Sequence, residues 1–230
     1  MTGCSRRRER KINMELEGKR IAFLGDSITQ GVGASAPDKV FHQVILQKYG
    51  LREALNFGLG GTRIARQYTP SEDDWWDETF LDRAKKIPLD VDAVVAFGGT
   101  NDYGHGDAPM GKFEDRTEET FYGACHALMA YLSVTFAGKP VIFMTPLHRT
   151  GEDGKVVNGI KTERRLKDYV DAEKRVAEYY AIPVLDLFAE SGMQPNLERH
   201  AELFFVDGLH PNDAGYARIA EKLGKYLENF

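Results

Sequence analysis

The stretch Ala93-Val-Val-Ala-Phe97, followed by Gly98-Gly99, gives the clearest indication of this protein's fold. Its residues are apolar with no polar residue between them, and the two glycines end the run. A short, continuous apolar run that stops at glycine is typical of a strand with both faces buried. This stretch therefore predicts a central strand of a parallel sheet.

On both sides of this stretch, short apolar runs alternate with longer segments that have helical spacing. We expect strands at residues 20–24, 54–57, 93–97, 141–144 and 182–187. We expect helices at residues 37–49, before Lys86, and at 118–134, 162–180 and 213–228, with Asn212 capping the last. Strands separated by such helices form βαβ units, so we predict one doubly wound α/β domain with helices on both faces of its sheet.

The composition is that of an ordinary globular domain. The chain has 230 residues and a formal net charge of −5. A negative net charge argues against nucleic acid or an anionic membrane as the main partner. Cys4 and Cys125 lie far apart, which excludes a disulfide framework and a cysteine-rich zinc site. No apolar run approaches the roughly 18 residues that a membrane span requires.

Residues 1–19 differ from the rest of the chain. The run from Arg6 to Lys11 is strongly basic, and no apolar stretch of the length found in signal peptides follows it. We therefore expect residues 1–19 to form a disordered extension, residues 20–230 to form the domain, and the protein to be cytoplasmic. Met14 is an alternative start of the natural product.

Polar and glycine-rich segments follow the first three predicted strands. They are Gly25-Asp26-Ser27, the segment 56–62, and the segment 98–102. Ligands bind a parallel sheet beyond the carboxyl ends of its strands, so we expect these segments to lie together at one edge. A fourth segment, Asp207-Gly-Leu-His210, lies near the C-terminus.

These segments contain the groups that acyl transfer requires. A serine hydroxyl becomes a nucleophile when a histidine accepts its proton and a carboxylate orients the imidazole. Ser27 is the candidate nucleophile, and a single turn of chain can bring Asp207 and His210 together. The developing oxyanion also needs hydrogen-bond donors. The candidates are the backbone N–H groups of Ser27 and Gly61 and the side-chain amide of Asn101.

The four segments, in this order, resemble those of the SGNH hydrolases, also called the GDSL lipase/acylhydrolase family. The resemblance covers about residues 20–228, and the first block reads Gly-Asp-Ser-Ile instead of Gly-Asp-Ser-Leu. It implies a flavodoxin-like three-layer α/β/α sandwich with a five-stranded parallel sheet. It also implies Ser27 as nucleophile, His210 as base and Asp207 as its orienting acid. Gly61 and Asn101 would be oxyanion donors, and neither a metal nor an organic cofactor is expected.

Each of these residues also has a structural interpretation. Ser27 could cap the helix that follows it, and Asn101 could cap the segment after the third strand. Gly61 could be needed only for a turn with positive φ. Asp26 and Asp102 are expected to shape their loops by accepting backbone hydrogen bonds rather than to take part in the chemistry.

Two other motifs predict different functions. The segment 31–36 matches a dinucleotide-binding fingerprint, with Glu53 at a suitable distance, but six residues separate it from the strand that should precede it directly. A metal cluster would need a second pair of ligands at recognised spacing, which is missing. The candidate metal ligands are Asp102, His105, Asp107 and His148.

Loops at the same edge of the sheet are expected to determine substrate specificity. The predicted substrate-binding residues are Tyr68, Tyr103, His105, His148 and Arg149. Trp75 and Trp76 are expected to be buried. Arg63, Arg66 and Arg149 could bind an anionic group of the substrate, or form ion pairs with the acidic residues 72–74.

The combined hypothesis is a serine ester hydrolase whose partner is a small-molecule ester. Aromatic and polar loop residues suit a sugar ring, and no long apolar lid helix is present in the sequence. We therefore expect removal of a small acyl group, most plausibly acetyl, from a carbohydrate or another small polar alcohol. The alternatives are a lysophospholipase or acyl thioesterase with the same catalytic residues, and a non-catalytic flavodoxin-like binding module.

Overall fold

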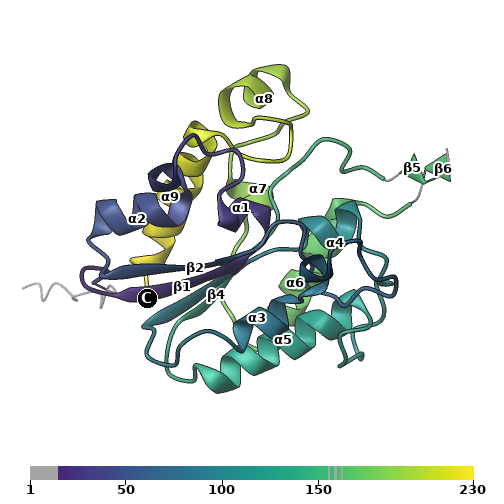
Figure 1. The fold of residues 1–230 in the computed structure, drawn as a ribbon, viewed down its shortest axis with the longest axis horizontal. Coiled ribbons are helices and arrows are strands. Elements are labelled where there is room, and N and C mark those ends of the chain that lie inside the picture. Colours follow the sequence, from purple (N-terminus) through teal and green to yellow (C-terminus); the bar gives the residue numbers. More distant parts are fainter. Residues whose placement is uncertain (1–14, 155, 158–159, 162) are drawn as a thin grey trace, which may run out of the picture.

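The computed structural model describes residues 15–154, 156–157, 160–161 and 163–230. Among these residues, five strands form a parallel sheet in the order β2-β1-β3-β4-β7, which is the flavodoxin-like order (Figure 1). The predicted α/β fold and the central position of β3 are confirmed. The strands are Arg20–Gly25 (β1), Glu53–Gly58 (β2), Ala93–Phe97 (β3), Val141–Met144 (β4) and Val184–Leu185 (β7).

Helices cover both faces of this sheet, as Figure 1 shows. α2 (Phe41–Tyr49) and α9 (Asp213–Leu227) pack on one face. α3 (Phe80–Ala84), α5 (Phe121–Thr135) and α6 (Leu166–Tyr179) pack on the other. In the part of the chain that the structure describes, no helix combines the length and apolar character needed to cross a membrane.

Alternating side chains of the strands build two separate cores. Ala22 and Leu24 of β1 pack with α3, α5 and α6, whereas Ile21 and Phe23 pack with α2 and α9. Every residue of β3 is at most 2% exposed. A strand buried on both faces needs an apolar residue at each position, which explains the uninterrupted run at 93–97.

Short elements follow the strands and link the helices. α1 (Ser27–Gln30) follows β1, α4 (Thr100–Gly104) follows β3, and α7 (Leu187–Glu190) follows β7. In Figure 1, helix α8 and the hairpin of β5 and β6 project from the domain. The remaining elements are the 3₁₀ turns η1 (Pro37–Lys39) and η2 (Asp74–Asp77), helix α8 (Glu198–Phe204), and strands β5 (Val156–Val157) and β6 (Ile160–Lys161).

Two predicted elements differ from the structure. The helix predicted at 37–49 is divided at Val40, whose extended backbone separates η1 from α2. The fifth strand covers Val184–Leu185 instead of residues 182–187. Asp186 accepts a hydrogen bond from the N–H of Ala189 (3.1 Å) and caps α7, so the chain turns into a helix there.

The predicted start of the domain at residue 20 was wrong. Leu16 is 4% exposed and belongs to the core on the α2 and α9 face. The carbonyl of Lys19 accepts a hydrogen bond from the N–H of Arg52 (2.8 Å), which ties this segment to β2. Residues 15–19 are therefore part of the folded domain, and the rest of the predicted extension, residues 1–14, lies outside the described residues.

The start of α9 is joined to the segment that follows β1. Asn212 caps α9, as predicted, by accepting hydrogen bonds from the second and third residues of the helix. Tyr216, one turn later, is completely buried. Its hydroxyl contacts the carbonyl oxygens of Val32 (2.7 Å) and Ile28 (3.0 Å). One side chain thus connects the two ends of the domain.

We predict that Tyr216→Phe destabilises the protein by about 1–3 kcal/mol, because it removes the hydroxyl that bonds the buried carbonyl of Ile28 and the partly buried carbonyl of Val32. The free energy of unfolding in urea measures this effect. Tyr179→Phe is the matched control, since that side chain is 59% exposed, and it should change stability by less than about 0.5 kcal/mol. Equal effects of the two substitutions would contradict a stabilising role of the Tyr216 hydroxyl between α9 and the segment after β1.

Candidate active site

Ser27 lies at the carboxyl end of β1, as the first residue of α1. The helix is capped by Asp26, whose carboxylate accepts a hydrogen bond from the N–H of Ile28 (2.9 Å), so the interpretation of Ser27 as the cap was wrong. The turn is tight, since a Cβ on Gly25 would lie 1.9 Å from the hydroxyl of Thr29. Glycine at this position lets the chain turn directly from the strand into the helix.

His210 reaches Ser27 from the opposite end of the sequence. Its Nε2 lies 2.9 Å from the Ser27 hydroxyl oxygen, and its Nδ1 lies 2.7 Å from a carboxylate oxygen of Asp207. The other carboxylate oxygen of Asp207 accepts hydrogen bonds from the N–H groups of Leu209 (2.9 Å) and His210 (2.7 Å). The turn therefore holds the carboxylate and the imidazole in a fixed relation to each other.

The same contacts determine the charge of Asp207. Partial burial by itself would raise the pKa of this carboxyl. The hydrogen bonds from the imidazole and from the two backbone N–H groups outweigh burial and hold the pKa below its ordinary value. The carboxylate is consequently ionised at neutral pH and can accept a hydrogen bond from an imidazolium.

The candidate oxyanion donors follow the two strands beside β1. Gly25 pairs with Gly58 of β2 and with Phe97 of β3, so the loops after these strands meet beside Ser27. Gly61 has a φ of 76°. The backbone N–H groups of Ser27 and Gly61 donate to no residue in the described ranges.

Asn101 is 5% exposed and lies in α4. Its side-chain amide donates a hydrogen bond to the carbonyl of Thr62 (2.9 Å), which orients the group. An amide has two N–H donors, and one hydrogen bond leaves the second for a ligand. The cap of α4 is Gly99, so the alternative interpretation of Asn101 as a helix cap was wrong.

Two buried carboxyl groups support these loops. Asp102 accepts hydrogen bonds from the N–H groups of Ile64 (3.0 Å) and Ala65 (2.9 Å), and Asp26 caps α1 as described above. Burial raises the pKa of both carboxyl groups to about 6, although the backbone hydrogen bonds oppose it. The prediction that Asp26 and Asp102 shape their loops is confirmed.

Trp76 lies against the candidate oxyanion loop. A Cβ on Gly61 would be 3.1 Å from the indole nitrogen of Trp76. Arg63 holds the turn that carries this indole, because it donates hydrogen bonds to the carbonyl of Trp76 (3.1 Å) and to Asp77 (2.9 Å). The expectation of burial was wrong for Trp75, which is 46% exposed.

The predicted substrate-binding aromatic residues lie in different surroundings. Tyr68 is 59% exposed, as expected of a loop residue. Tyr103 is 2% exposed, packs edge-on against Tyr169, and directs its hydroxyl to the carbonyl of Gly151. The ring of Tyr103 thus belongs to the core, and its contact with substrate stays a prediction. His105 is exposed and contacts Arg63 through Nδ1 (3.0 Å).

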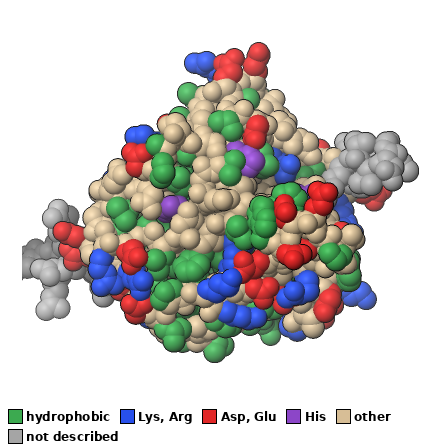
Figure 2. All heavy atoms as spheres, viewed as in Figure 1, with side chains coloured by type: hydrophobic (Ala, Val, Ile, Leu, Met, Phe, Trp, Pro, Cys, Tyr) green, Lys and Arg blue, Asp and Glu red, His purple; other side chains and the backbone are tan. Residues whose placement is uncertain are grey.

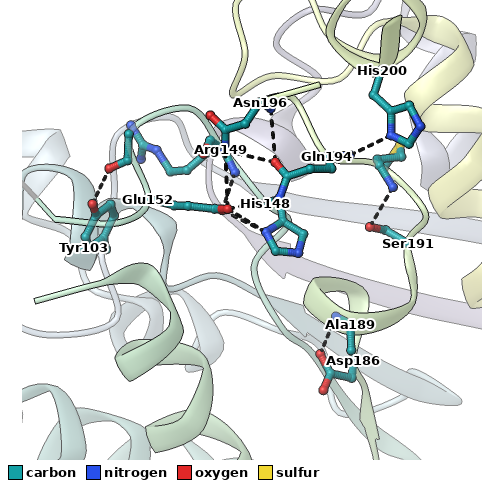
Figure 3. A network of polar contacts seen from close by, with 12 residues as sticks. Tyr103, His148, Arg149, Glu152, Asp186, Ala189, Ser191, Gln194, Asn196 and His200 are labelled. Atoms are coloured by element: carbon teal, nitrogen blue, oxygen red, sulfur yellow. Dashed lines mark hydrogen bonds and ion pairs between the residues drawn. The ribbon is translucent and has the colours of Figure 1, made fainter. Parts of the chain in front are cut away.

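Figure 3 shows a polar network around Glu152 that sequence reasoning missed. The buried carboxylate of Glu152 contacts His148 Nδ1 (2.9 Å), the amide of Gln194 (3.2 Å) and the amide of Asn196 (3.4 Å). The N–H of Arg149 also donates to it (3.0 Å). His148 and Arg149 are predicted from the sequence, but Glu152, Gln194 and Asn196 are not, because the members come from two loops that are far apart in the sequence.

This network is connected to the turn that carries His210. The N–H of Thr150 donates a hydrogen bond to the carbonyl of Gly208 (2.9 Å). Gly208 has a φ of 78°, and a Cβ on it would lie 2.6 Å from the Thr150 methyl group. The loop after β4 therefore supports the Asp207–His210 turn from one side.

The structure does not assemble the two rival motifs. Gly33 of the fingerprint-like segment packs near the carbonyl of Pro211 and does not lead directly from a strand into a helix. The candidate metal ligands contact different partners. Asp107 accepts hydrogen bonds from the backbone N–H groups of residues 68–69, and His148 contacts the carboxylate of Glu152. Among the described residues, no three His, Cys, Asp or Glu side chains form a group that could hold a metal ion.

Known proteins resemble this chain in sequence and fold. Residues 23–218 match the GDSL-like lipase/acylhydrolase family. A crystal structure of a protein from Lactobacillus plantarum is 32% identical, with a TM-score of 0.78, and the alignment covers 92% of this chain and 97% of that chain. No curated protein matches this chain.

Two more distant structures share the fold. A lipase/acylhydrolase from Enterococcus faecalis is 19% identical, with a TM-score of 0.60, and the alignment covers 91% of this chain and 95% of that chain. An acetyl xylan esterase is 21% identical, with a TM-score of 0.59, and the alignment covers 90% of this chain and 98% of that chain.

A further buried acid lies behind the candidate oxyanion loop. Glu173 of α6 is 2% exposed, and neither carboxyl oxygen has a hydrogen-bond partner among the described residues. A Cβ on Gly99 would lie 2.2 Å from one of these oxygens. Burial raises the pKa of Glu173 well above its ordinary value, and the nearby carboxylates of Asp102 and Asp26 raise it further.

We predict that Glu173→Gln changes the pH dependence of stability. A raised pKa means that the folded protein holds a proton that the unfolded chain releases above about pH 4.3, so this group destabilises the fold as the pH rises. The free energy of unfolding of the variant relative to wild type should be constant below pH 4. It should then increase by roughly 1 kcal/mol per pH unit. A difference that does not vary with pH would contradict the burial of a neutral acid.

Proposed function

We propose that this chain, which belongs to the GDSL-like lipase/acylhydrolase family, hydrolyses carboxylic esters through an acyl-enzyme on Ser27. The observation that carries the proposal is the hydrogen-bonded series from Asp207 through His210 to the Ser27 hydroxyl, with separations of 2.7 and 2.9 Å. These separations are within the range expected of a nucleophile, its base and the carboxylate that orients the base.

In the first half of the reaction, the Ser27 oxygen attacks the ester carbonyl while His210 Nε2 accepts the hydroxyl proton. Asp207 stabilises the resulting imidazolium through Nδ1–H. The tetrahedral intermediate carries a negative oxygen, which the N–H groups of Ser27 and Gly61 and the amide of Asn101 would bind. Collapse of the intermediate breaks the bond to the alcohol, which leaves with the proton of the imidazolium.

In the second half, water replaces the alcohol. His210 accepts a proton from the water molecule as its oxygen attacks the acyl-enzyme carbonyl. The same donors bind the second oxyanion. When this intermediate collapses, the Ser27 oxygen takes the proton back from His210 and the carboxylic acid is released.

Several features favour a short acyl group on a polar alcohol. The indole of Trp76 lies beside Gly61, a candidate oxyanion donor, and would limit the size of the acyl group there. Polar side chains of the Glu152 network come from the loop after β4 and the segment after α7, and such side chains suit hydroxyl groups. A structure with the same fold is an acetyl xylan esterase. We therefore propose an acetyl ester of a carbohydrate or other small polar alcohol as the substrate class.

We predict that Ser27→Ala lowers kcat for acetyl-ester hydrolysis by a factor on the order of 10⁴ or more, because the nucleophile is lost. Ser133→Ala on α5 is the control and should retain wild-type activity. The assay should compare acetyl esters, long-chain esters and acyl thioesters at equal concentration, so that each acyl preference is tested. Full activity of Ser27→Ala would refute the mechanism.

We predict that Gly61→Ala lowers kcat by up to about 10², because the new methyl group displaces the N–H donor or the Trp76 indole. Gly138→Ala is the matched control, since Gly138 also has a positive φ, 82°, but no atom within 4 Å of the added methyl group. Both variants should lose some stability, about 1–2 kcal/mol. If both also lost the same activity, the proposed role of Gly61 would be wrong.

A further inference from the structure

The three candidate arginines differ in their ion pairs. Arg63 pairs with Asp77 at 2.9 Å, and Arg66 pairs with Glu118 at 3.0 Å. The predicted pairing of these arginines with residues 72–74 was wrong. The guanidinium of Arg149 is within 4.0 Å of no carboxylate in the described part of the chain. It is therefore the candidate whose charge is not neutralised by a direct partner.

Arg149 lies directly beside the candidate oxyanion loop. Its Nη1 donates hydrogen bonds to the carbonyl (3.2 Å) and the hydroxyl (3.3 Å) of Thr100, the residue before Asn101. A Cβ on Gly104, at the end of α4, would lie 2.7 Å from the same nitrogen. Its Nε is buried and has no hydrogen-bond partner among the described residues. The guanidinium thus packs closely on α4 through Nη1, whereas Nη2 donates to no residue in the described part of the chain.

The backbone ties Arg149 to the candidate site, because the N–H of the next residue, Thr150, donates a hydrogen bond to the carbonyl of Gly208 in the Asp207–His210 turn (2.9 Å). Burial lowers the pKa of Arg149, while the fields of Tyr103, Asp26 and Asp207 oppose that shift. Asp26 flanks Ser27, and Asp207 contacts His210. An arginine remains charged under these conditions, and a partly buried charge without a direct counter-ion is unfavourable. An anion at this position would therefore be stabilised.

The neighbouring carboxylate of Glu152 does not form an ion pair with the Arg149 guanidinium. Glu152 is the nearest acid in the sequence, and it accepts hydrogen bonds from His148, Gln194 and the backbone of Arg149. Figure 3 shows these contacts directed at the carboxylate from the loops around it. The oxygens of Glu152 therefore accept hydrogen bonds from the network, and its field acts on the Arg149 guanidinium without a direct ion pair.

We propose that Arg149 binds an anionic group, a carboxylate or a phosphate, on the ester substrate. This inference rests on the proposed esterase function and narrows its substrate class to acylated alcohols that carry one anionic group, such as acetylated sugar acids or sugar phosphates. The net charge of −5 disfavours polyanions but allows a single anionic group beside a local cation.

The test compares three esters that differ in charge: acetylated glucose, acetylated glucuronic acid and acetylated glucose 6-phosphate. Wild-type protein should hydrolyse at least one anionic ester with a kcat/KM about 10–100 times that of the neutral ester, as expected for a charged hydrogen bond. The anionic ester with the larger ratio identifies the group. Arg149→Gln should lower kcat/KM for the anionic ester by more than it lowers kcat/KM for acetylated glucose, so that the ratio of the two falls to about 1.

Two further variants complete the design. Arg149→Lys should keep part of the preference, because it retains the charge but loses the planar donor group. Arg199→Gln is the charge-matched control on α8, since its side chain is 81% exposed and pairs with Glu202, and it should leave the ratio unchanged. If Arg149→Gln does not fold, the salt dependence of wild type decides: KM for the anionic ester alone should rise with ionic strength.

The outcomes separate this inference from the proposed function. If wild type hydrolyses all three esters with similar kcat/KM, or if Arg149→Gln lowers all three equally, Arg149 only supports the Thr100 turn and the inference is overturned. A KM that does not change with ionic strength for any of the three esters would also overturn the inference. If wild type hydrolyses no ester in any panel, the proposed function itself fails.

Discussion

The hydrogen bond between His210 Nε2 and the Ser27 hydroxyl is the contact on which the proposed chemistry depends. The two residues are 183 positions apart, so the whole domain must fold before they meet. β1 presents Ser27 at its carboxyl end, and the turn before α9 presents His210. Tyr216 of α9 contacts carbonyl groups of the Ser27 segment and thereby fixes the separation of the two residues.

The loops around this contact are held by buried polar groups. Asp26 and Asp102 accept hydrogen bonds from backbone N–H groups. Both side chains are nearly inaccessible to solvent, and this burial raises the pKa of each carboxyl group. Glu173 lies in the same region without a hydrogen-bond partner among the described residues. Groups of this kind lower stability near neutral pH, so the loop geometry is maintained at the expense of folding free energy.

The sequence predicts the parallel sheet well because its strands are continuous apolar runs, of which residues 93–97 are the clearest. It also places Ser27, Asp207 and His210 at turns that the structure brings together. Local patterns do not reveal whether a loop residue turns inward, as Tyr103 does, or outward, as Trp75 does. The network around Glu152 and the side-chain position of Arg149 depend on loops that meet only in the folded chain, and no spacing rule predicts them.

The reactivity of Ser27 tests the central claim most directly. Intact-protein and peptide mass spectrometry after treatment with a fluorophosphonate should show one added group, located on Ser27. The rate of addition should fall by at least about 10³ in His210→Ala, because the hydroxyl then lacks its base. Labelling of Ser27 at equal rates in wild type and His210→Ala, or no labelling of Ser27 in folded wild-type protein, would contradict the account.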